Sequence, residues 1–493
     1  MKKGEIYEGK VMEMTFPNKG HVCVEGEEDS VMVKNALPGQ TISFRMTKRK
    51  HGKYEGTLLA VTEPGPDELP VPACEHAGVC GGCIYQTFPY EKQLELKSSQ
   101  VLSLLRPVLP NVEELFEGIR KSPRQAGYRN KMEYTFGDEY KDGPLSLGMH
   151  KRGAFYDIVP VTGCQIADAD FGRILEATRE YFAKRGIAHF HRMRHDGYLR
   201  HLLVRKAAYT GEILIDLVTT GAKGLTDMDS QSDVSENELL ACWCETIASL
   251  SLEGQITGIL HTTNDTVADV VKDEGTEILY GKDSFEETCL GLSFTITPFS
   301  FFQTNSLGAE VLYETAREYI SEELDGSDKT VYDLYSGTGT IAQLLAPAAK
   351  KVIGVEIVEE AVEAARINAK KNGLENCEFL AGDVLKVLDE ITEKPDLIVL
   401  DPPRDGVHPK ALNHIISYGV DSILYISCKP TSLARDLVAL QAGGYEVRRL
   451  CCVDMFPGTA NVETIVYLSN KNVKPKDYVE ISAECRKILP SWR

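Results

Sequence analysis

The chain has 493 residues, enough for two to four domains at about 100–200 residues each. Hydrophobic residues make up 43% and charged residues 26%, which excludes a wholly disordered or fibrous chain. No apolar run approaches the about 18 residues of a membrane span, and no apolar segment follows the first residues, so we expect a cytoplasmic protein without membrane contact.

The net charge of −19 argues against a protein that coats nucleic acid, but the charge is unevenly distributed. Residues 221–293 hold fifteen acidic residues against three lysines. Two other segments are basic: 120–131 has five lysines and arginines and no acid, and 184–206 has seven against Asp196 alone. Each is open to two interpretations, a surface for a phosphate backbone or a solvated face of an acidic protein.

Residues 4–61 contain five short stretches of strand-forming residues separated by turn signals. Five short strands in fewer than sixty residues predict a small β-barrel of the oligonucleotide-binding kind, and we set this domain at 1–62. The prolines of 64–66 and 70–72 predict a stiff linker after it.

Residues 63–90 form a cysteine-rich loop with the spacing Cys74-x5-Cys80-x2-Cys83. The chain has thirteen cysteines, and clustered cysteines in a cytosolic protein more often bind metal or act in catalysis than form disulfides. A fourth ligand is needed, and we choose Cys164 in Val161-Thr162-Gly163-Cys164. Four thiolates hold either zinc or an iron–sulfur cluster, and the spacing alone does not separate the two.

The rest of the chain divides into two patterns. Residues 91–106 predict a helix, and strand-like and helix-like pieces alternate to about 290, so we expect a central α+β domain over 91–300. From about 306 a strand, a glycine-rich turn and a helix repeat regularly. This pattern predicts an open, mostly parallel α/β sheet over 301–493.

Acidic residues stand at the ends of successive predicted strands in this last domain. The glycine-rich stretch Asp333–Thr340 follows the first strand, Glu356 lies 23 residues after Asp333, and Asp383 and Asp401 end the next two strands. Glycines there let the backbone approach a ligand, and an acid at the second strand end can hold a ribose diol. Acidic strand ends suit a cationic or neutral nucleoside such as S-adenosylmethionine better than a triphosphate.

Two further residues provide the chemistry of a reaction at that edge. Cys428 ends the next predicted strand, and Lys429 beside it could favour the reactive thiolate, although a lone cysteine at a strand end is often inert packing. Glu463 is the natural proton acceptor. A thiolate that adds to carbon 6 of uracil makes carbon 5 nucleophilic toward a methyl sulfonium, and a base then removes the proton from carbon 5.

These motifs together resemble one family, the RNA uracil-5-methyltransferases, in the branch with an N-terminal TRAM β-barrel and an iron–sulfur cluster. The resemblance covers essentially the whole chain. It rests on the barrel, the four-cysteine pattern and the motifs FFQTN at 301–305, DLYSGTGT at 333–340, DPPRDG at 401–406, SCKPTSLARDL at 427–437 and DMFPGT at 454–459 followed by Glu463.

The resemblance implies a Rossmann-like methyltransferase domain and a role for each matching residue. Cys428 is then the nucleophile and Glu463 the base. The implied contacts of S-adenosylmethionine are Gln303, Tyr335, Gly337, Glu356, Asp383 and Asp401. The implied ligands of a [4Fe–4S] cluster are Cys74, Cys80, Cys83 and Cys164, and the implied RNA-binding residues are Arg129, Asn130 and Lys131. The implied substrate is a uridine of 23S rRNA, and the implied state is a monomer.

One departure from the family and three alternatives remain. Many members have histidine where this chain has Asn461, which puts a proton relay at that position in doubt. The same chemistry could act on tRNA. An amino-group methyltransferase is disfavoured because Arg404 stands where those enzymes have an aromatic residue after Asp-Pro-Pro. A non-catalytic RNA-binding assembly factor is disfavoured because Cys428 and Glu463 are both present.

Overall fold

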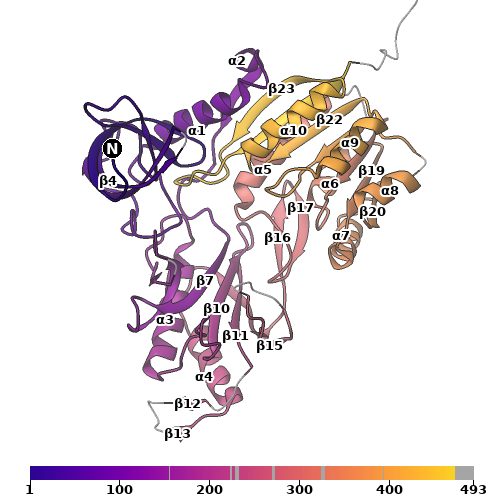
Figure 1. Cartoon of the computed structure of the whole chain (residues 1–493). Coiled ribbons are helices and arrows are strands. Elements are labelled where there is room, and N and C mark those ends of the chain that lie inside the picture. Colours follow the sequence, from indigo (N-terminus) through magenta and orange to yellow (C-terminus); the bar gives the residue numbers. More distant parts are fainter. Residues whose placement is uncertain are drawn as a thin grey trace, which may run out of the picture.

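A computed structural model of the chain describes residues 1–50, 52–154, 156–221, 225–227, 232–268, 273–323, 328–391 and 393–471. Figure 1 shows a barrel at the N-terminal end, a central body below it, and an α/β sheet that carries the C-terminal elements. Among the described residues, no helix has the length and apolar character needed to cross a membrane.

The N-terminal strands form a closed barrel of five strands in the order β1-β2-β3-β5-β4. The strands are β1 (Ile6–Thr15), β2 (Lys19–Cys23), β3 (Val31–Lys34), β4 (Thr41–Lys50) and β5 (Lys53–Glu63). Side chains alternate as a barrel requires: Val31 and Val33 are fully buried, whereas Met32 and Lys34 between and after them are not. A small barrel is present where the sequence predicts one, and its assignment to the TRAM type stays a prediction.

The central body is built on a seven-stranded sheet in the order β15-β14-β11-β10-β7-β8-β9. Its strands are β7 (Lys131–Asp138), β8 (Leu145–His150), β9 (Ile158–Val159), β10 (Leu199–Lys206), β11 (Glu212–Thr219), β14 (Gln255–Thr263) and β15 (Thr276–Gly281). Helices α3 (Ala169–Lys184) and α4 (Glu236–Ala248) pack on it around Phe171, Phe182 and Trp243. Two hairpins complete this region: β12 (Thr226–Asp227) with β13 (Ser232–Asp233), and β16 (Phe285–Cys289) with β17 (Leu292–Ile296).

The C-terminal part is an eight-stranded sheet in the order β20-β19-β18-β21-β22-β24-β23-β6. Its strands are β18 (Thr330–Leu334), β19 (Lys351–Glu356), β20 (Cys377–Ala381), β21 (Leu397–Leu400), β22 (Ser422–Ser427), β23 (Tyr445–Val453), β24 (Glu463–Asn470) and β6 (Phe116–Arg120). The strands β18 to β22 are parallel, and β24 runs antiparallel to β22. This confirms the predicted α/β sheet.

Helices cover both faces of this sheet. One face packs against α5 (Ser306–Glu323), α6 (Thr340–Leu345) and α7 (Glu359–Lys371), and a short 3-10 helix, η1 (Ala346–Ala348), follows α6. The other packs against α8 (Val384–Glu390), α9 (Pro409–Tyr418) and α10 (Pro430–Ala442). The middle strands β21 and β22 are buried along their whole length, because a parallel sheet covered on both faces leaves no position facing water.

The sheet also takes in elements from far earlier in the chain. Helix α1 (Tyr90–Leu105) packs Val101 and Leu105 into the same core as α10 (Figure 1). Helix α2 (Val112–Leu115) follows, and β6 pairs parallel with β23. The sequence grouped residues 91–300 in one central domain, but α1 and β6 lie on the C-terminal sheet. Strand β6 covers what would otherwise be the open edge of β23, whose backbone groups need partners.

Candidate active site

The parallel strands β18, β19, β20, β21 and β22 end on one edge of the C-terminal sheet. Asp333 is the penultimate residue of β18, Glu356 ends β19, Asp401 directly follows β21 and Cys428 directly follows β22. Because parallel strands align their carboxyl ends, these side chains gather at one edge, as the sequence predicts.

The turn between β18 and α6 departs from ordinary backbone geometry. Tyr335 has a φ of 69°, a left-handed conformation that costs about 1–3 kcal/mol for a residue other than glycine. The backbone N–H groups of Tyr335 and Ser336 both donate to the carbonyl of Val355 at 3.0 Å, which holds the turn against β19. Strain of this kind concentrates at ligand-binding sites, so this turn is a candidate contact for a bound molecule.

Glu356 organises the same turn through its carboxylate. One oxygen accepts a hydrogen bond from the N–H of Gly337 at 3.0 Å, and the other accepts from Ile357 and Val358 at 2.9 and 3.0 Å. The carboxylate is therefore fixed in position at the strand end. Asp383 also lies at this edge, exposed, and caps α8 by accepting from the N–H of Leu385 at 2.8 Å.

Asp333 is completely buried beneath the turn. Its Oδ2 accepts from the N–H of Ala342 at 3.0 Å, but its Oδ1 finds no hydrogen-bond partner among the residues the structure describes. Burial, followed by the charges of Asp401 and Glu356, raises the pKa of Asp333 well above its usual range. Burial likewise raises the pKa of Asp401 to about 7. Crowded carboxyls of this kind favour a cationic ligand.

Cys428 and Glu463 lie opposite each other at the ends of neighbouring strands. In the antiparallel ladder of β22 and β24, Ser427 pairs with Thr464, so the next residues on each side are Cys428 and Glu463. Glu463 is 5% exposed and Cys428 is half-buried. The two residues predicted as nucleophile and base are therefore brought together.

The ionisation of this pair is set by burial and by shared neighbours. Burial, then Glu463 and Asp401, raise the pKa of the Cys428 thiol to about 11. Burial and Asp401 raise the pKa of Glu463 to about 8. Both groups are thus mostly protonated at neutral pH in the protein without ligands. Nearby positive charge is needed to form the thiolate.

The chain supplies one such charge from Arg404, a residue to which the sequence interpretation gave no role in the site. The guanidinium of Arg404 lowers the pKa of both Cys428 and Glu463. The sequence interpretation gave this role to Lys429, whose ammonium instead lies 3.9 Å from the carboxylate of Asp405. The sequence does contain a sign of this role, the arginine directly after Asp-Pro-Pro. In the sequence analysis that arginine was used only as an argument against an amino-group methyltransferase.

Replacing Arg404 by methionine should therefore raise the pKa of Cys428 and slow its alkylation at any fixed pH below that pKa. The measurement is the rate of modification of Cys428 by iodoacetamide against pH, followed by peptide mass. Arg448→Met is the matched control, because Arg448 lies 3.7 Å from Glu446 on β23. A pH profile in Arg404→Met that coincides with that of the unsubstituted protein would contradict this role.

The segment 301–306 lies beside the glycine-rich turn and carries Gln303. The hydroxyl of Thr338 in the turn donates to the carbonyl of Phe301 at 3.1 Å. The amide of Gln303 hydrogen-bonds the buried Tyr313, whose pKa is raised first by burial and then by Asp401. Gln303 therefore belongs to the same edge as Asp401.

Asn130 attaches this segment to the central sheet, and Arg205 attaches the residues directly before it. The side-chain amide of Asn130 donates to the carbonyl of Gln303 at 3.0 Å and to the hydroxyl of Ser306 at 2.8 Å. The buried guanidinium of Arg205 donates to the carbonyls of Thr297 and Ser300 at 2.7 and 2.8 Å. The sequence predicted Asn130 as an RNA contact and did not single out Arg205.

The flanking residues of that predicted RNA contact are partly enclosed. The Nε of Arg129 donates to the carbonyl of Lys131 at 3.1 Å. Burial, followed by the charge of Arg205, lowers the pKa of Lys131 to about 8. Binding of RNA by Arg129, Asn130 and Lys131 stays a prediction.

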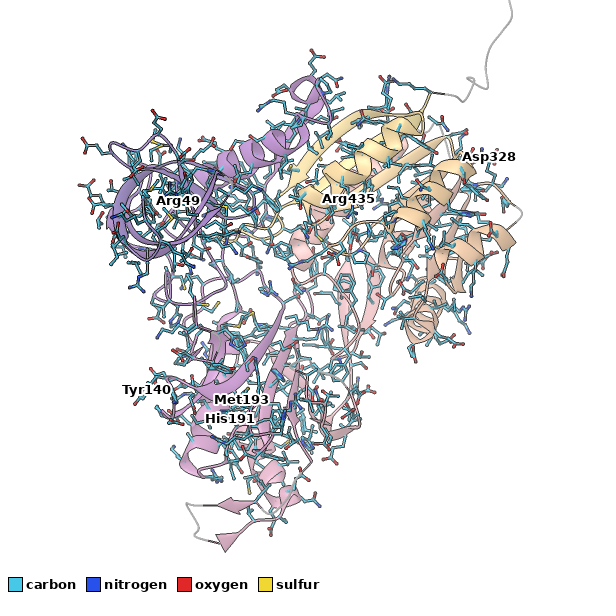
Figure 2. The ribbon with its side chains drawn as sticks, viewed as in Figure 1. Arg49, Tyr140, His191, Met193, Asp328 and Arg435 are labelled. Atoms are coloured by element: carbon cyan, nitrogen blue, oxygen red, sulfur yellow. The ribbon has the colours of Figure 1, made fainter. Side chains whose placement is uncertain are left out.

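Several cations of the two basic segments have partners within the chain, some on the surface and some buried. Their ion pairs and carbonyl contacts include Arg120 with Glu318, Lys121 with Glu91, Arg194 with Asp196, Arg205 with Thr297, and Lys206 with Asp168 and Asp170. His191 and Met193 of the second segment line a pocket of about 330 Å³ on the central body, apart from the α/β sheet (Figure 2). Arg205 is buried and Lys206 is largely enclosed, whereas the ion pairs of Arg120, Lys121 and Arg194 lie on the surface. Exposed pairs are weak, so they leave the choice between an RNA surface and a solvated face open.

The four predicted metal ligands share one neighbourhood. Burial first, and then the neighbouring Cys164, Cys80 and Cys74, raise the pKa of the Cys83 thiol to about 12. Cys164 thus lies with the cysteines of 63–90 although it is far from them in sequence. In the described part of the chain, however, no group of three or more histidine, cysteine or acidic side chains is arranged to hold a metal ion.

The chain is similar to known methyltransferases in sequence. A methyltransferase-domain family model matches residues 325–440. A protein of Clostridium tetani named uncharacterized RNA methyltransferase is 47% identical over 473 residues, which cover 96% of this chain and 99% of the relative. One with the same description from Caldanaerobacter subterraneus is 46% identical over 466 residues, 94% of this chain and 99% of the relative.

A solved structure covers nearly the whole chain. It is the Pyrococcus abyssi tRNA (uracil-54, C5)-methyltransferase in complex with S-adenosyl-L-homocysteine, with a TM-score of 0.68 and 23% sequence identity. The match covers 93% of this chain and 100% of that chain. At this identity, the likeness shows that the two chains share a fold, including the Rossmann-like sheet.

Proposed function

This chain belongs to the RNA methyltransferase family, and from that premise we propose that it transfers the methyl group of S-adenosylmethionine to carbon 5 of a uridine in RNA. The observation that carries the proposal is the placement of Cys428 opposite Glu463, at the same sheet edge as the crowded carboxyls. Carbon 5 of uracil is a poor nucleophile, so its methylation calls for a thiolate that adds to carbon 6 and a base that removes the proton, whereas methylation of an amino group needs no cysteine.

In the proposed reaction the Sγ of Cys428 bonds to carbon 6 of the uracil ring, and the electrons of the double bond move toward the carbonyl at carbon 4. S-adenosylmethionine supplies a methyl group on a positively charged sulfur. Carbon 5 takes that methyl group as the bond from the methyl carbon to sulfur breaks, which leaves S-adenosylhomocysteine as a neutral thioether. The carboxylate of Glu463 then removes the remaining proton from carbon 5. The double bond re-forms and the bond from carbon 6 to Cys428 breaks, which returns the thiolate.

The residues at the sheet edge fit this methyl donor. Oδ1 of the buried Asp333 has no partner among the described residues, burial and neighbouring carboxylates raise the pKa of Asp333, and burial raises that of Asp401. A sulfonium cation nearby would favour the charged form of both carboxyls. We assign the donor to the residues that share this edge: Gln303, Tyr335, Gly337, Glu356, Asp383 and Asp401. A triphosphate would meet the same carboxyls with like charge.

We further propose that Cys74, Cys80, Cys83 and Cys164 hold a [4Fe–4S] cluster. The support is the mutual influence of the four thiols within one buried neighbourhood. These thiols are not gathered as tightly as the ligands of a single ion. The proposal therefore rests on the shared neighbourhood of the four thiols and on the resemblance in the cysteine pattern.

The proposed substrate is 23S rRNA, on the strength of the combined barrel and cysteine pattern. A target uridine stacked within folded RNA cannot reach Cys428, so it must flip out at a cost of a few kcal/mol. We propose that the barrel and Arg129–Lys131 hold the surrounding RNA. The alternative is a uridine of tRNA, the substrate named for the Pyrococcus abyssi enzyme, with the same roles for Cys428 and Glu463.

Incubation with methyl-labelled S-adenosylmethionine tests both parts of the proposal. Undermodified ribosomal RNA and transfer RNA are offered separately, and the labelled nucleoside is identified after digestion. We expect label in 5-methyluridine from ribosomal RNA. Label in 5-methyluridine from transfer RNA alone would keep the chemistry and overturn the substrate. Label in another nucleoside, or in neither RNA, would contradict the reaction itself.

A further inference from the structure

The connection between β23 and β24, residues 454–462, ends at the proposed base Glu463 and is held from outside the α/β sheet. The carbonyl of Gly458 accepts hydrogen bonds from the N–H groups of Ile84 and Tyr85, both at 2.9 Å. The N–H of Gly458 donates to the side chain of Gln93 on α1 at 2.7 Å. Gly458 has a φ of 79°, which favours glycine, and a Cβ there would lie 2.7 Å from Gln86.

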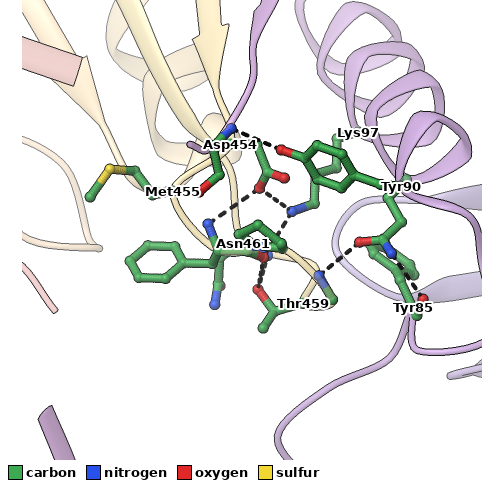
Figure 3. Close-up of polar contacts among 12 residues, drawn as sticks. Tyr85, Tyr90, Lys97, Asp454, Met455, Thr459 and Asn461 are labelled. Carbon is green, nitrogen blue, oxygen red and sulfur yellow. Dashed lines mark hydrogen bonds and ion pairs between the residues drawn. The ribbon is translucent and has the colours of Figure 1, made fainter. Parts of the chain in front are cut away.

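A buried ion pair fixes the start of this connection. The ammonium of Lys97, on α1, lies 2.6 Å from Oδ1 of Asp454, and both side chains are 0% exposed (Figure 3). The same ammonium donates to the carbonyl of Phe456 at 3.1 Å, and the N–H of Phe456 donates to Oδ1 of Asp454 at 3.2 Å. Two contacts of Lys97 therefore hold Asp454 and Phe456 on α1, and the third joins these two residues to each other.

Stability alone is a poor explanation for this pair. Burying two charges costs as much hydration as their attraction returns, and a well-packed apolar pair of the same size would serve the fold at least as well. What an ion pair adds is one defined register between the two elements that carry it. Here those elements are α1 and the end of β23.

That register bears directly on the base. Asp454 follows Val453, and Val453 pairs with Glu463 across the ladder of β23 and β24. The side chain of Asn305 donates to the carbonyl of Met455 at 2.8 Å, from the segment that carries Gln303. A shift of residues 454–456 would therefore move Glu463 relative to both Cys428 and the donor site.

A small apolar core extends the same link to the barrel. It contains Met14 and Leu37 from the barrel, Tyr85 and Phe88 from the cysteine-rich segment, and Ala460 from the connection. The connection thus packs against the barrel and the cysteine-rich segment, both of which lie outside the methyltransferase sheet.

We infer that Lys97 and Asp454 are positioning residues that hold Glu463 in place to remove the proton from carbon 5. This inference rests on the proposed function. Neither residue contacts the reacting atoms; they act through the backbone of β23 and of the connection. Without the pair, Cys428 should still form its bond to the uracil and the methyl group should still transfer, but the final elimination should slow.

The test measures the amounts of protein–RNA adduct and of released product for three variants and for the unsubstituted protein. Lys97→Met leaves Asp454 buried without a partner and could fail to fold, so the double variant Lys97→Met/Asp454→Asn, which removes both charges, is made as well. The matched control is Lys92→Met, because Lys92 lies on an exposed part of α1 and pairs with Glu95 at 2.9 Å. The readout is the ratio of RNA-linked protein that survives denaturation to released methylated RNA.

We expect the double variant to raise this ratio by about ten- to a hundredfold, since a displacement of about 1 Å can slow a step by that amount. Lys92→Met should match the unsubstituted protein. A merely structural role would lower adduct and product together and leave the ratio unchanged. An unchanged ratio, or a double variant that does not fold, would overturn the inference.

Glu463→Gln, measured in parallel, separates this inference from the proposed function. If Glu463→Gln accumulates adduct and the double variant does not, the positioning role is wrong and the proposed base stands. If Glu463→Gln itself accumulates none, the assigned base is wrong, and the positioning role assigned through it is overturned as well.

Discussion

Replacing Cys428 by alanine or serine should lower methyl transfer by about 10⁴-fold or more, the scale seen when a covalent nucleophile is removed. Without the thiolate, carbon 5 of uracil has no source of electrons with which to attack the methyl group. Serine does not rescue the reaction, because a hydroxyl is far less ionised than a thiol. The measurement is label transferred to RNA at saturating S-adenosylmethionine.

Binding of S-adenosylmethionine to the Cys428 variants should stay close to that of the unsubstituted protein, because Cys428 attacks the base and the donor contacts other residues. Isothermal calorimetry measures this. Cys242→Ser is the matched control: Cys242 is exposed on α4 of the central body and should be dispensable. Methyl transfer that persists in Cys428→Ala would refute covalent catalysis by this residue.

Replacing Glu463 by glutamine should have the second large effect, accumulation of a protein–RNA adduct that resists denaturation. Glutamine has the same size as glutamate but cannot accept a proton. Bond formation by Cys428 and methyl transfer can then occur, whereas the elimination that frees Cys428 cannot. Gel mobility under denaturing conditions measures the adduct. Glu446→Gln, at a partly exposed position on β23 away from the sheet edge of the site, is the control that should release product normally.

In the unsubstituted protein, the rate of the elimination step should depend on the ionisation of Glu463. Burial and Asp401 raise the pKa of Glu463 to about 8, so the carboxyl is mostly protonated below that pH. A protonated carboxyl cannot act as a base, and the rate of product release should rise as the pH rises through about 8. A release rate that falls over this range would speak against Glu463 as the base.

Local sequence patterns were enough to predict the sheet and the edge at which the site lies. The apolar runs at 397–400 and 422–427 are the buried middle strands β21 and β22. The residues that end such strands in a parallel sheet must share an edge, so the strand pattern alone was enough to group Glu356, Asp401 and Cys428. The barrel was predicted for a similar reason, the succession of short strand-forming stretches separated by turn signals.

Contacts between segments that are far apart in the chain could not be predicted from local sequence patterns. Lys97 and Asp454 are 357 residues apart, and nothing in either local pattern points to the other. The pairing of β6 with β23 likewise joins segments whose sequences carry no mark of it. Composition counts charges without their partners: Arg120 and Lys121 have exposed acidic partners, and Lys206 has partly buried ones. The composition of the basic segments therefore does not decide between an RNA surface and a solvated face.

The most direct test of the proposed chemistry is to identify the linked residue and base in the Glu463→Gln adduct. The complex is formed with S-adenosylmethionine and RNA, digested with protease and nuclease, and analysed by tandem mass spectrometry. We expect a peptide with a methylated uridine attached to Cys428. A link at another cysteine, a nucleoside other than uridine, or an adduct without the methyl group would contradict C5-methylation through Cys428.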